Sequence, residues 1–282
     1  MKYFFTLLSL LILSSALVQA QGLPIPQPSP AQTVKQSFAT AFIEVSYSRP
    51  GLKGRKAFGD VVPFGKLWRT GANSATTIEF GDEFFVNGVS FSKGKYGLVT
   101  IPKESEWEVI LTKDLNVTSE QAFKPENVVT RFITKTEKLN DVVETFTIDF
   151  TNIKPTSADV VLKWDQIQVR FTVKADIDTK IMAAIEKEMK NDKRPFHSAA
   201  NYYYENGKDL KQALEWENKA LEANPTAYWM LHLKAKIQHK LGDNAGALDT
   251  ANKSMEEARK ADGDAYVKMN EALIAEIKSG KK

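Results

Sequence analysis

The chain has 282 residues, 43% hydrophobic and 26% charged, a composition ordinary for globular protein and a length that permits two domains. Its 38 basic and 35 acidic residues give a formal net charge of +3, too small for the global field that attracts nucleic acid or a membrane surface. We therefore expect no nucleic-acid partner. The absence of cysteine excludes disulfides, thiolate metal ligands and a cysteine nucleophile.

Residues 1–20 have the pattern of a secretory signal peptide. Lys2 precedes an apolar run from Tyr3 to Leu17, and residues 18–20 (VQA) offer the small-residue spacing that a signal peptidase accepts. The alternative, a membrane anchor, needs roughly 20 apolar residues, and this run is shorter and interrupted by threonine and serine. We expect cleavage, no transmembrane segment afterwards, and a periplasmic or secreted location.

Residues 21–32 form the next segment, in which proline alternates with other residues. Proline cannot donate a backbone hydrogen bond and favours extended polyproline geometry. This segment therefore predicts a linker. Its prolines are Pro24, Pro26, Pro28 and Pro30.

Residues 33–175 alternate apolar and polar positions, the period of strands with one buried face. Many short strands at short intervals predict an all-β, sandwich-like domain. Asn87-Gly88 predicts a tight hairpin turn, because both residues tolerate positive φ, and Asp165-Gln166 predicts a further turn. The expected strands are Phe42–Tyr47, Thr76–Phe80, Glu83–Val86, Val89–Phe91, Tyr96–Ile101, Trp107–Leu111, Val128–Ile133, Val143–Phe150, Asp159–Trp164 and Ile167–Val173.

Residues 176–282 change to helical spacing of apolar residues, punctuated by glycine and proline, and predict an α-helical repeat domain. A chain that changes period once and does not change back is expected to form two modules. The expected helices are Ile177–Lys190, Phe196–Glu205, Leu210–Ala223, Ala227–Leu241, Ala245–Lys260 and Ala265–Lys278.

Two of the expected helical hairpins resemble each other at about the 34-residue period of tetratricopeptide repeats. Small residues recur at matching places, Ala213 with Ala247 and Ala220 with Ser254. The resemblance covers Arg194–Lys260 and implies a groove for a protein or peptide partner.

Aromatic residues at 202–204 and 228–229 allow two interpretations. They could line such a groove, or they could pack between stacked helices. Three consecutive tyrosines cannot all face inward on one helix, so both interpretations stay open.

The stretch from residue 47 to residue 73 is the strongest candidate ligand site, because cations, aromatic rings and glycines gather there. Guanidinium groups suit carboxylate or phosphate, and a tryptophan face suits a sugar ring, so we expect an anionic or carbohydrate ligand. The candidate residues are Tyr47, Arg49, Arg55, Lys66, Trp68, Arg69 and Asn73.

A purely structural interpretation of the same stretch is the alternative. In it the arginines pair with nearby carboxylates, and three aromatic residues fill a small core under a long loop. The carboxylates are Asp60, Glu79 and Asp82, and the aromatic residues are Phe58, Phe64 and Trp68.

No motif assigns a metal, a cofactor or a catalytic residue. The histidines are His197, His232 and His239, and the last two lie too far apart in sequence for the usual zinc pair. No G-x-S-x-G motif occurs, and Gly65-Lys66 is followed by leucine where a phosphate-binding loop needs serine or threonine. We expect no metal and no cofactor.

Six segments of the strand half have distinctive sequences: Tyr47–Gly51 (YSRPG), Gly54–Gly59 (GRKAFG), Val62–Asn73 (VPFGKLWRTGAN), Val86–Gly88 (VNG), Gly94–Pro102 (GKYGLVTIP) and the strand at Trp107. On these segments, residues Pro28–Val173 resemble the bacterial family catalogued as domain of unknown function 2911. The resemblance implies an exported β domain, often followed by a tetratricopeptide-like tail, and it implies no activity. One element common in the family, a tryptophan-glycine pair after the Trp107 strand, is missing from residues 115–123.

The preferred hypothesis for function is an exported envelope protein that binds a ligand at the basic, aromatic patch and a partner at the helical repeats. The alternative is a hydrolase-like enzyme acting on a glycan or other polar substrate. In it Glu79 or Asp60 would be the acid or base, and Arg69 and Asn73 would orient the substrate. A structural scaffold is the third hypothesis.

Overall fold

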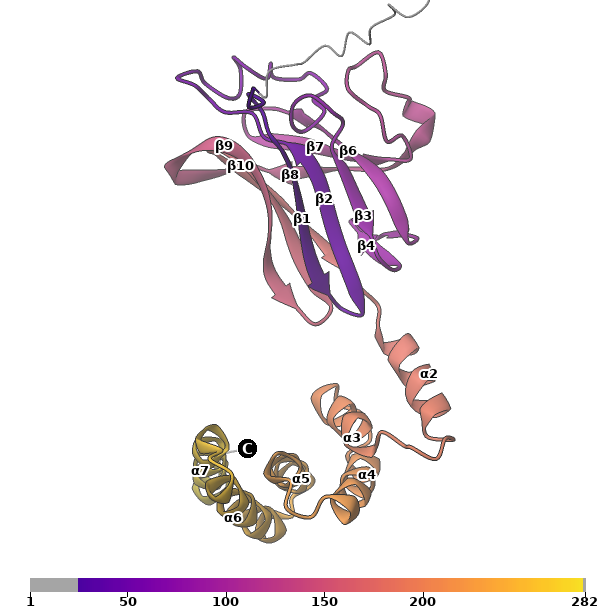
Figure 1. The fold of residues 1–282 in the computed structure, drawn as a ribbon, viewed down its shortest axis with the longest axis vertical. Helices are drawn as coiled ribbons and strands as arrows, with labels where there is room; N and C mark the ends of the chain where they lie inside the picture. The colour runs from indigo at the N-terminus through magenta and orange to yellow at the C-terminus, as the bar shows by residue number, and fades with distance from the viewer. Residues whose placement is uncertain (1–24, 281–282) are drawn as a thin grey trace, which may run out of the picture. The chain divides into compact units, whose positions relative to one another are not determined.

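The computed structural model describes residues 25–280, and they divide between Asp176 and Ile177 into two compact units. The first unit consists of strands and the second of helices (Figure 1), so the predicted order of a β domain followed by a helical domain is confirmed. The expected signal peptide and the first residues of the expected linker lie outside the described residues.

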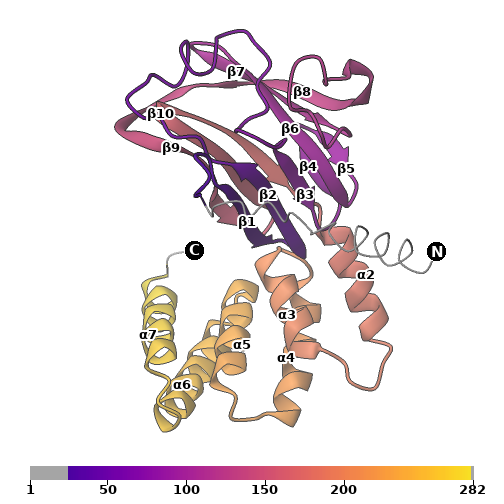
Figure 2. The same ribbon diagram turned by 45° about the horizontal axis from the view of Figure 1, so that its top comes forward.

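The β unit has two antiparallel sheets, which form two layers (Figures 1 and 2). One has six strands in the order β1-β2-β3-β6-β7-β8, and the other has four in the order β5-β4-β10-β9. The strands are β1 (Ala31–Phe38), β2 (Ala41–Ser48), β3 (Thr77–Phe80), β4 (Phe84–Val86), β5 (Val89–Phe91), β6 (Gly94–Pro102), β7 (Glu106–Thr112), β8 (Val128–Lys135), β9 (Glu137–Lys154) and β10 (Ser157–Lys174). A short 3-10 helix, η1 (Pro125–Asn127), precedes β8.

Strand β1 was not expected, and it begins at Ala31, inside the segment 21–32 that was expected to be a linker. It pairs with β2 along its whole length, from Ala31 opposite Ser48 to Phe38 opposite Ala41. Only Phe38 of this edge strand is buried, so its sequence lacks the hydrophobic alternation that predicts strands. Backbone pairing with β2 therefore accounts for the strand.

The hairpin between β4 and β5 confirms the predicted tight turn. Asn87 and Gly88 have φ values of 49° and 79°, and Val86 pairs with Val89 across them. Positive φ at both central residues is the geometry that matches the twist of the flanking strands.

Strand β10 doubles back on itself at Asp165, where φ is 55°. Thr172 Oγ1 donates to Asp159 Oδ1 (2.6 Å), and the Ala175 amide donates to the Thr156 carbonyl (3.0 Å). These contacts lie at matching distances before and after Asp165, so the two halves of β10 lie antiparallel and side by side. The structure thus has a turn where Asp165-Gln166 predicted one.

The core between the sheets is rich in aromatic rings. Trp68 stacks on Trp164 at 5.9 Å with an interplanar angle of 17°, and it meets Phe146 edge-on at 4.9 Å. Phe58 and Trp107 lie 4.8 Å apart in the same cluster. Such ring pairs add stability beyond the area that they bury.

The second unit contains six helices within the described residues. Asp209 caps the helix that follows it by accepting from the Lys211 amide (2.8 Å), and Gly242, at φ 89°, ends another helix in the left-handed conformation. The helices are α2 (Asp178–Glu188), α3 (Phe196–Glu205), α4 (Leu210–Ala223), α5 (Tyr228–Leu241), α6 (Asn244–Lys260) and α7 (Asp264–Ser279).

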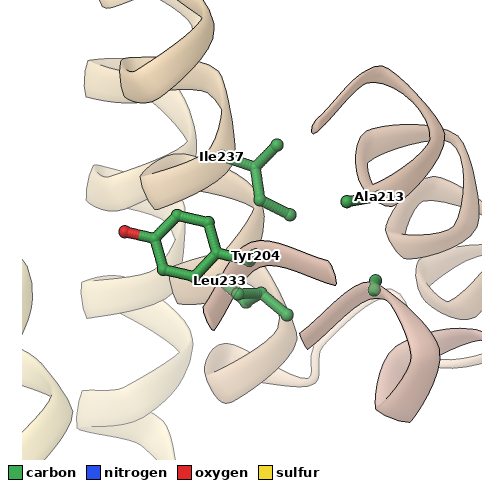
Figure 3. Close-up of a cluster of buried hydrophobic side chains, with 5 residues drawn as sticks. Tyr204, Ala213, Leu233 and Ile237 are labelled. Carbon is green, nitrogen blue, oxygen red and sulfur yellow. The ribbon is translucent and has the colours of Figure 1, made fainter. Parts of the chain in front are cut away.

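Small residues let α3, α4 and α5 pack closely. Ala200 of α3 and Ala213 of α4 are both 0% exposed, and they pack with Leu233 and Ile237 of α5. Figure 3 shows the ring of Tyr204 from α3 beside these α5 side chains. Ala213, one of the small residues that recur in the proposed repeat, therefore lets these helices pack closely.

None of the helices between residues 25 and 280 combines the length and apolar character that crossing a membrane requires.

Candidate functional site

The loop between β2 and β3, residues 49–76, builds the candidate site and is tied to both sheets. At its start the Leu52 amide donates to the Glu144 carbonyl of β9 (2.9 Å). Further along, Trp68 exchanges backbone hydrogen bonds with Thr100 of β6, at 2.7 and 3.0 Å. The loop is indigo to purple at one end of the sheets in Figure 1. Strands on either side therefore hold a segment that has little regular structure of its own.

A strained turn follows Trp68. Thr70 has φ 56°, which is uncommon for a β-branched residue, and its side chain is 0% exposed. Its carbonyl accepts from Thr76 Oγ1 (2.8 Å), and its hydroxyl lies 3.1 Å from that of Thr100. A backbone conformation of this kind costs about 1–3 kcal/mol and persists where the surroundings over-determine it, often at ligand sites.

Beside this turn lies a hollow of about 410 Å³. It brings together four of the seven candidate residues: Lys66, Trp68, Arg69 and Asn73. The rest of the lining is apolar side chains and glycine backbone, and no carboxylate lines the hollow within the described residues. The other lining residues are Pro50, Val61, Val62, Pro63, Leu67, Gly71, Ala72 and Trp164.

Both cations of the hollow lack a carboxylate partner among residues 25–280. Arg69 donates from Nη1 to the Asn73 carbonyl (2.7 Å), which uses one of the five N–H donors of a guanidinium. Lys66 is exposed and forms no ion pair or hydrogen bond within the described residues. Asn73 donates from Nδ2 to the Ser29 carbonyl (3.0 Å), and this leaves its amide oxygen for other contacts.

Trp68 is mainly a core residue, and little of it is accessible to a ligand. The residue is 8% exposed, one ring face stacks on Trp164, and Nε1 donates to the Gly71 carbonyl (2.9 Å). Phe58, Trp107 and Phe146 surround the rest of the ring, so Trp68 does not offer the open stacking face expected for a sugar ring. What Trp68 supplies is a fixed base for the turn that carries Arg69.

Tyr47 is also a core residue, 4% exposed, and it joins the sheets. Its hydroxyl donates to Gln32 Oε1 (2.9 Å) and accepts from the Ile148 amide of β9 (2.8 Å). β9 is an edge strand, so without this hydroxyl the Ile148 amide would have no partner. Burial raises the pKa of Tyr47, while the Ile148 hydrogen bond opposes that shift.

Arg49 and Arg55 do not line the hollow. Arg49 donates to the Phe146 carbonyl (3.1 Å) and to Thr147 Oγ1 (2.8 Å), and so fastens the loop to β9. Arg55 donates to the Leu52 carbonyl (3.0 Å) within an exposed turn. The four basic residues of the candidate set therefore divide into two groups. Arg49 fastens the loop and Arg55 lies exposed, whereas Lys66 and Arg69 line the hollow.

The pairing expected from the structural interpretation is not found, since Arg49, Arg55 and Arg69 form no ion pair within the described residues. Glu79 is bridged to Lys95 (3.4 Å). The aromatic part of that interpretation holds for Phe58 and Trp68, which are buried, whereas Phe64 is 38% exposed. Neither Glu79 nor Asp60 lines the hollow, so the acid or base of the hydrolase hypothesis does not meet Arg69 there.

The helical unit has a hollow of its own, about 530 Å³, between α2 and the α3–α4 pair. Met182, Ile185 and Met189 line one side, and Tyr203 and Trp216, with ring centroids 4.7 Å apart, line the other. Of the aromatic residues expected at a groove, Tyr203 lines this hollow.

Other residues of that aromatic set have different surroundings. Tyr204 is buried, and Trp229 is 42% exposed. Tyr202 donates to Asp178 Oδ1 (2.8 Å). The two interpretations of the aromatic residues therefore apply to different members of the set.

Each histidine has an internal partner. Nδ1 of His197 lies 2.9 Å from Glu217 Oε1, that of His232 lies 2.8 Å from Asn270 Oδ1, and that of His239 lies 2.7 Å from Asn244 Oδ1. In the part of the chain that the structure describes, no group of three histidine, aspartate or glutamate residues could hold a metal ion.

Comparison with known proteins adds one decisive observation. A family model described as protein of unknown function (DUF2911) matches residues 29–173 of the 282. The chain belongs to the DUF2911 family. The match covers the β unit with the loop hollow and ends before the helices, so the tetratricopeptide likeness of the helical unit stays a prediction. No curated protein and no solved structure matches the chain.

Proposed function

We propose that this DUF2911 protein is an exported binding protein, which captures a carboxylate or phosphate group of a polar ligand in the loop hollow of its β unit. One observation carries the proposal: Lys66 and Arg69 line a hollow of about 410 Å³ whose described lining contains no carboxylate. A concave site with two unpaired cations and apolar walls suits an anion, since the walls reduce the screening of the charges by water.

The strained turn supports the same proposal. Thr70 holds an unfavourable φ of 56°, and the aromatic core fixes Trp68 directly before it, so Arg69 is placed before a ligand arrives. Preorganisation of this kind lowers the entropy cost of binding. The missing carboxylate also favours binding over acid–base hydrolysis, which needs a proton donor or acceptor within reach of the substrate.

The test measures affinity by calorimetry for inorganic phosphate and for glucuronate, with glucose as the uncharged comparison. Arg69→Ala should weaken binding of both anions about tenfold or more, because a charge-assisted hydrogen bond contributes about 1.5–3 kcal/mol. Lys66→Ala should weaken it by a smaller factor, and higher salt should weaken it in the parent.

Arg55→Ala is the matched control, because Arg55 is an arginine of the same loop that also donates to a backbone carbonyl but does not line the hollow. This variant should keep parental affinity. Equal losses in the Arg55 and Arg69 variants, or glucose binding as tight as glucuronate, would remove the hollow as the anion site.

A second proposal concerns the helical unit, which we infer presents its methionine-lined hollow to an apolar segment of a protein partner. Methionine side chains adapt to varied apolar surfaces, and Tyr203 and Trp216 form the opposing wall. A photoreactive residue in place of Met189 should crosslink to the partner in cells. The same residue in place of exposed Glu256 of α6 should not, and equal crosslinking from both positions contradicts the proposal.

A further inference from the structure

A small hollow of about 180 Å³ lies where three turns of the β unit meet. It is lined by residues within 56–64 of the loop, 103–107 around the turn between β6 and β7, and 165–167 at the bend of β10. We call it the turn hollow. It shares no lining residue with the loop hollow, although both use the segment between β2 and β3.

The inner wall of the turn hollow is apolar. Phe58 and Trp107 are 4% and 1% exposed, and Ile167 is half-buried beside them. Phe64 is 38% exposed and forms an outer wall, where its ring lies so close to Gly59 that a Cβ atom there would be 3.0 Å from it. An apolar cavity of about 150 Å³ takes up benzene, so the turn hollow has room for one six-membered ring.

The indole N–H of Trp107 is an unused donor in this wall. Its Nε1 donates to no group within the described residues, unlike those of Trp68 and Trp164. The fully enclosed side-chain atoms without a partner belong, in the described part of the chain, to Asp114 and Arg170, so Nε1 of Trp107 still reaches open space. Buried indole N–H groups usually have a partner, and an acceptor on a bound molecule would supply one.

Four charged side chains line the same hollow, two basic and two acidic, so their formal charges cancel. Three of the four are exposed and one is half-buried, whereas Phe58 and Trp107 are buried. The charges therefore lie toward the solvent and the rings lie inside. The charged residues are Lys56, Lys103, Glu104 and Asp165.

These opposite charges do not pair with one another within the described residues. Lys56 and Glu104 form no ion pair there, although they line one small hollow. Lys103 is bridged to Glu106 (3.4 Å), which does not line the hollow, and Asp165 accepts one hydrogen bond from a backbone amide of the loop (3.2 Å). An ammonium and a carboxylate group of one ligand would each find a partner of opposite charge here.

The apolar and charged parts of the turn hollow together describe its occupant. A ring fits beside Phe58 and Trp107, and a hydroxyl oxygen on that ring can accept from the Trp107 indole. The other end of the molecule reaches the exposed charges. A sugar ring complements the hollow less well, because its several hydroxyl groups would lose water and find a single donor on the inner wall.

We propose that the turn hollow binds a free amino acid with a phenol side chain. The phenol ring lies against Phe58 and Trp107, and its oxygen accepts from Trp107 Nε1. Glu104 receives the α-ammonium group, and Lys56 receives the α-carboxylate. The site is separate from the loop hollow, so it stands or falls independently of anion capture.

The test follows the Trp107 indole N–H resonance of the full chain during titration with tyrosine. We expect a saturable shift, and nuclear Overhauser contacts from the tyrosine ring to the Ile167 methyl groups, which line the turn hollow. Phenylalanine lacks the hydroxyl, tyramine lacks the carboxylate, and para-hydroxyphenylpropionate lacks the ammonium group. Each of these three should bind more weakly than tyrosine, by about threefold or more.

Glu104→Gln should weaken tyrosine binding about threefold or more, and it should leave the binding of para-hydroxyphenylpropionate, which has no ammonium group, unchanged. Glu120→Gln is the matched control. Glu120 is also an exposed glutamate whose backbone carbonyl accepts a hydrogen bond, but it does not line the hollow. Arg69→Ala, in the loop hollow, should keep parental affinity for tyrosine.

Three results would overturn the proposal. One is the absence of a saturable shift with tyrosine, and another is an affinity for any of the three analogues equal to that for tyrosine. The third is an equal effect of Glu104→Gln and Glu120→Gln. Loss of tyrosine binding in Arg69→Ala would overturn it as well, because it would place the amino acid in the loop hollow.

Discussion

At the scale of single residues, the candidate set illustrates how position in the fold divides residues of similar chemistry. Lys66, Trp68, Arg69 and Asn73 meet at one hollow because one short turn carries them. Such proximity along the chain is visible in a sequence. The burial of Tyr47 and Trp68 is not, because it depends on rings of β9 and β10 that lie about a hundred residues further along.

The hydroxyl of Tyr47 provides a test of how the two sheets are joined. Tyr47→Phe leaves the Ile148 amide buried without an acceptor, so the free energy of unfolding should fall by about 1–3 kcal/mol. Denaturant titration measures this. Tyr96→Phe is the control: the Tyr96 hydroxyl bonds the Ser92 carbonyl (2.9 Å) at an exposed site, and its loss should cost less. Equal losses in the two variants would contradict the role assigned to Tyr47.

At the scale of elements, helices were more predictable than strands. The six expected helices match the observed ones to within two residues at each end, because amphipathic spacing and glycine stops act locally. Strand β1 was missed, because an edge strand with one buried residue has almost no apolar signal.

Helix α5 contains a buried titratable group with a predictable pH effect. His232 is 7% exposed, and burial lowers its pKa below the ordinary 6.5, with the Asn270 hydrogen bond opposing and Lys236 adding to the shift. The folded state therefore favours the neutral ring, whose contribution to stability is complete above pH 6.5 and is lost as pH falls through the lowered value.

Replacing His232 should remove this dependence. The free energy of unfolding of the parent should fall relative to that of His232→Gln as pH drops below 6.5, by up to about 1.4 kcal/mol per pH unit. The measurement is the difference in the free energy of unfolding between the two proteins. Burial raises the pKa of Glu217, so the contribution of Glu217 to stability falls as pH rises above 4.5. Both proteins contain Glu217, and taking the difference removes this contribution. A slope unchanged in His232→Gln contradicts the assignment.

At the scale of the whole molecule, two units of different architecture each have a buried core, an aromatic one between sheets and a small-residue one between helices. The family match covers only the β unit, which contains the loop hollow. Proposed recognition of an anion thus belongs to the family domain, and proposed recognition of an apolar segment belongs to the helices.

The most direct test of anion capture is a crystal of the full chain soaked in selenate, a tetrahedral anion that anomalous scattering locates. The account predicts the strongest anomalous peak in the loop hollow, within hydrogen-bond distance of the Arg69 guanidinium and close to the Lys66 ammonium. The peak should disappear in Arg69→Ala and remain in Arg55→Ala. An empty hollow in the parent crystal, with selenate bound at Arg49 or Arg55 instead, would contradict it.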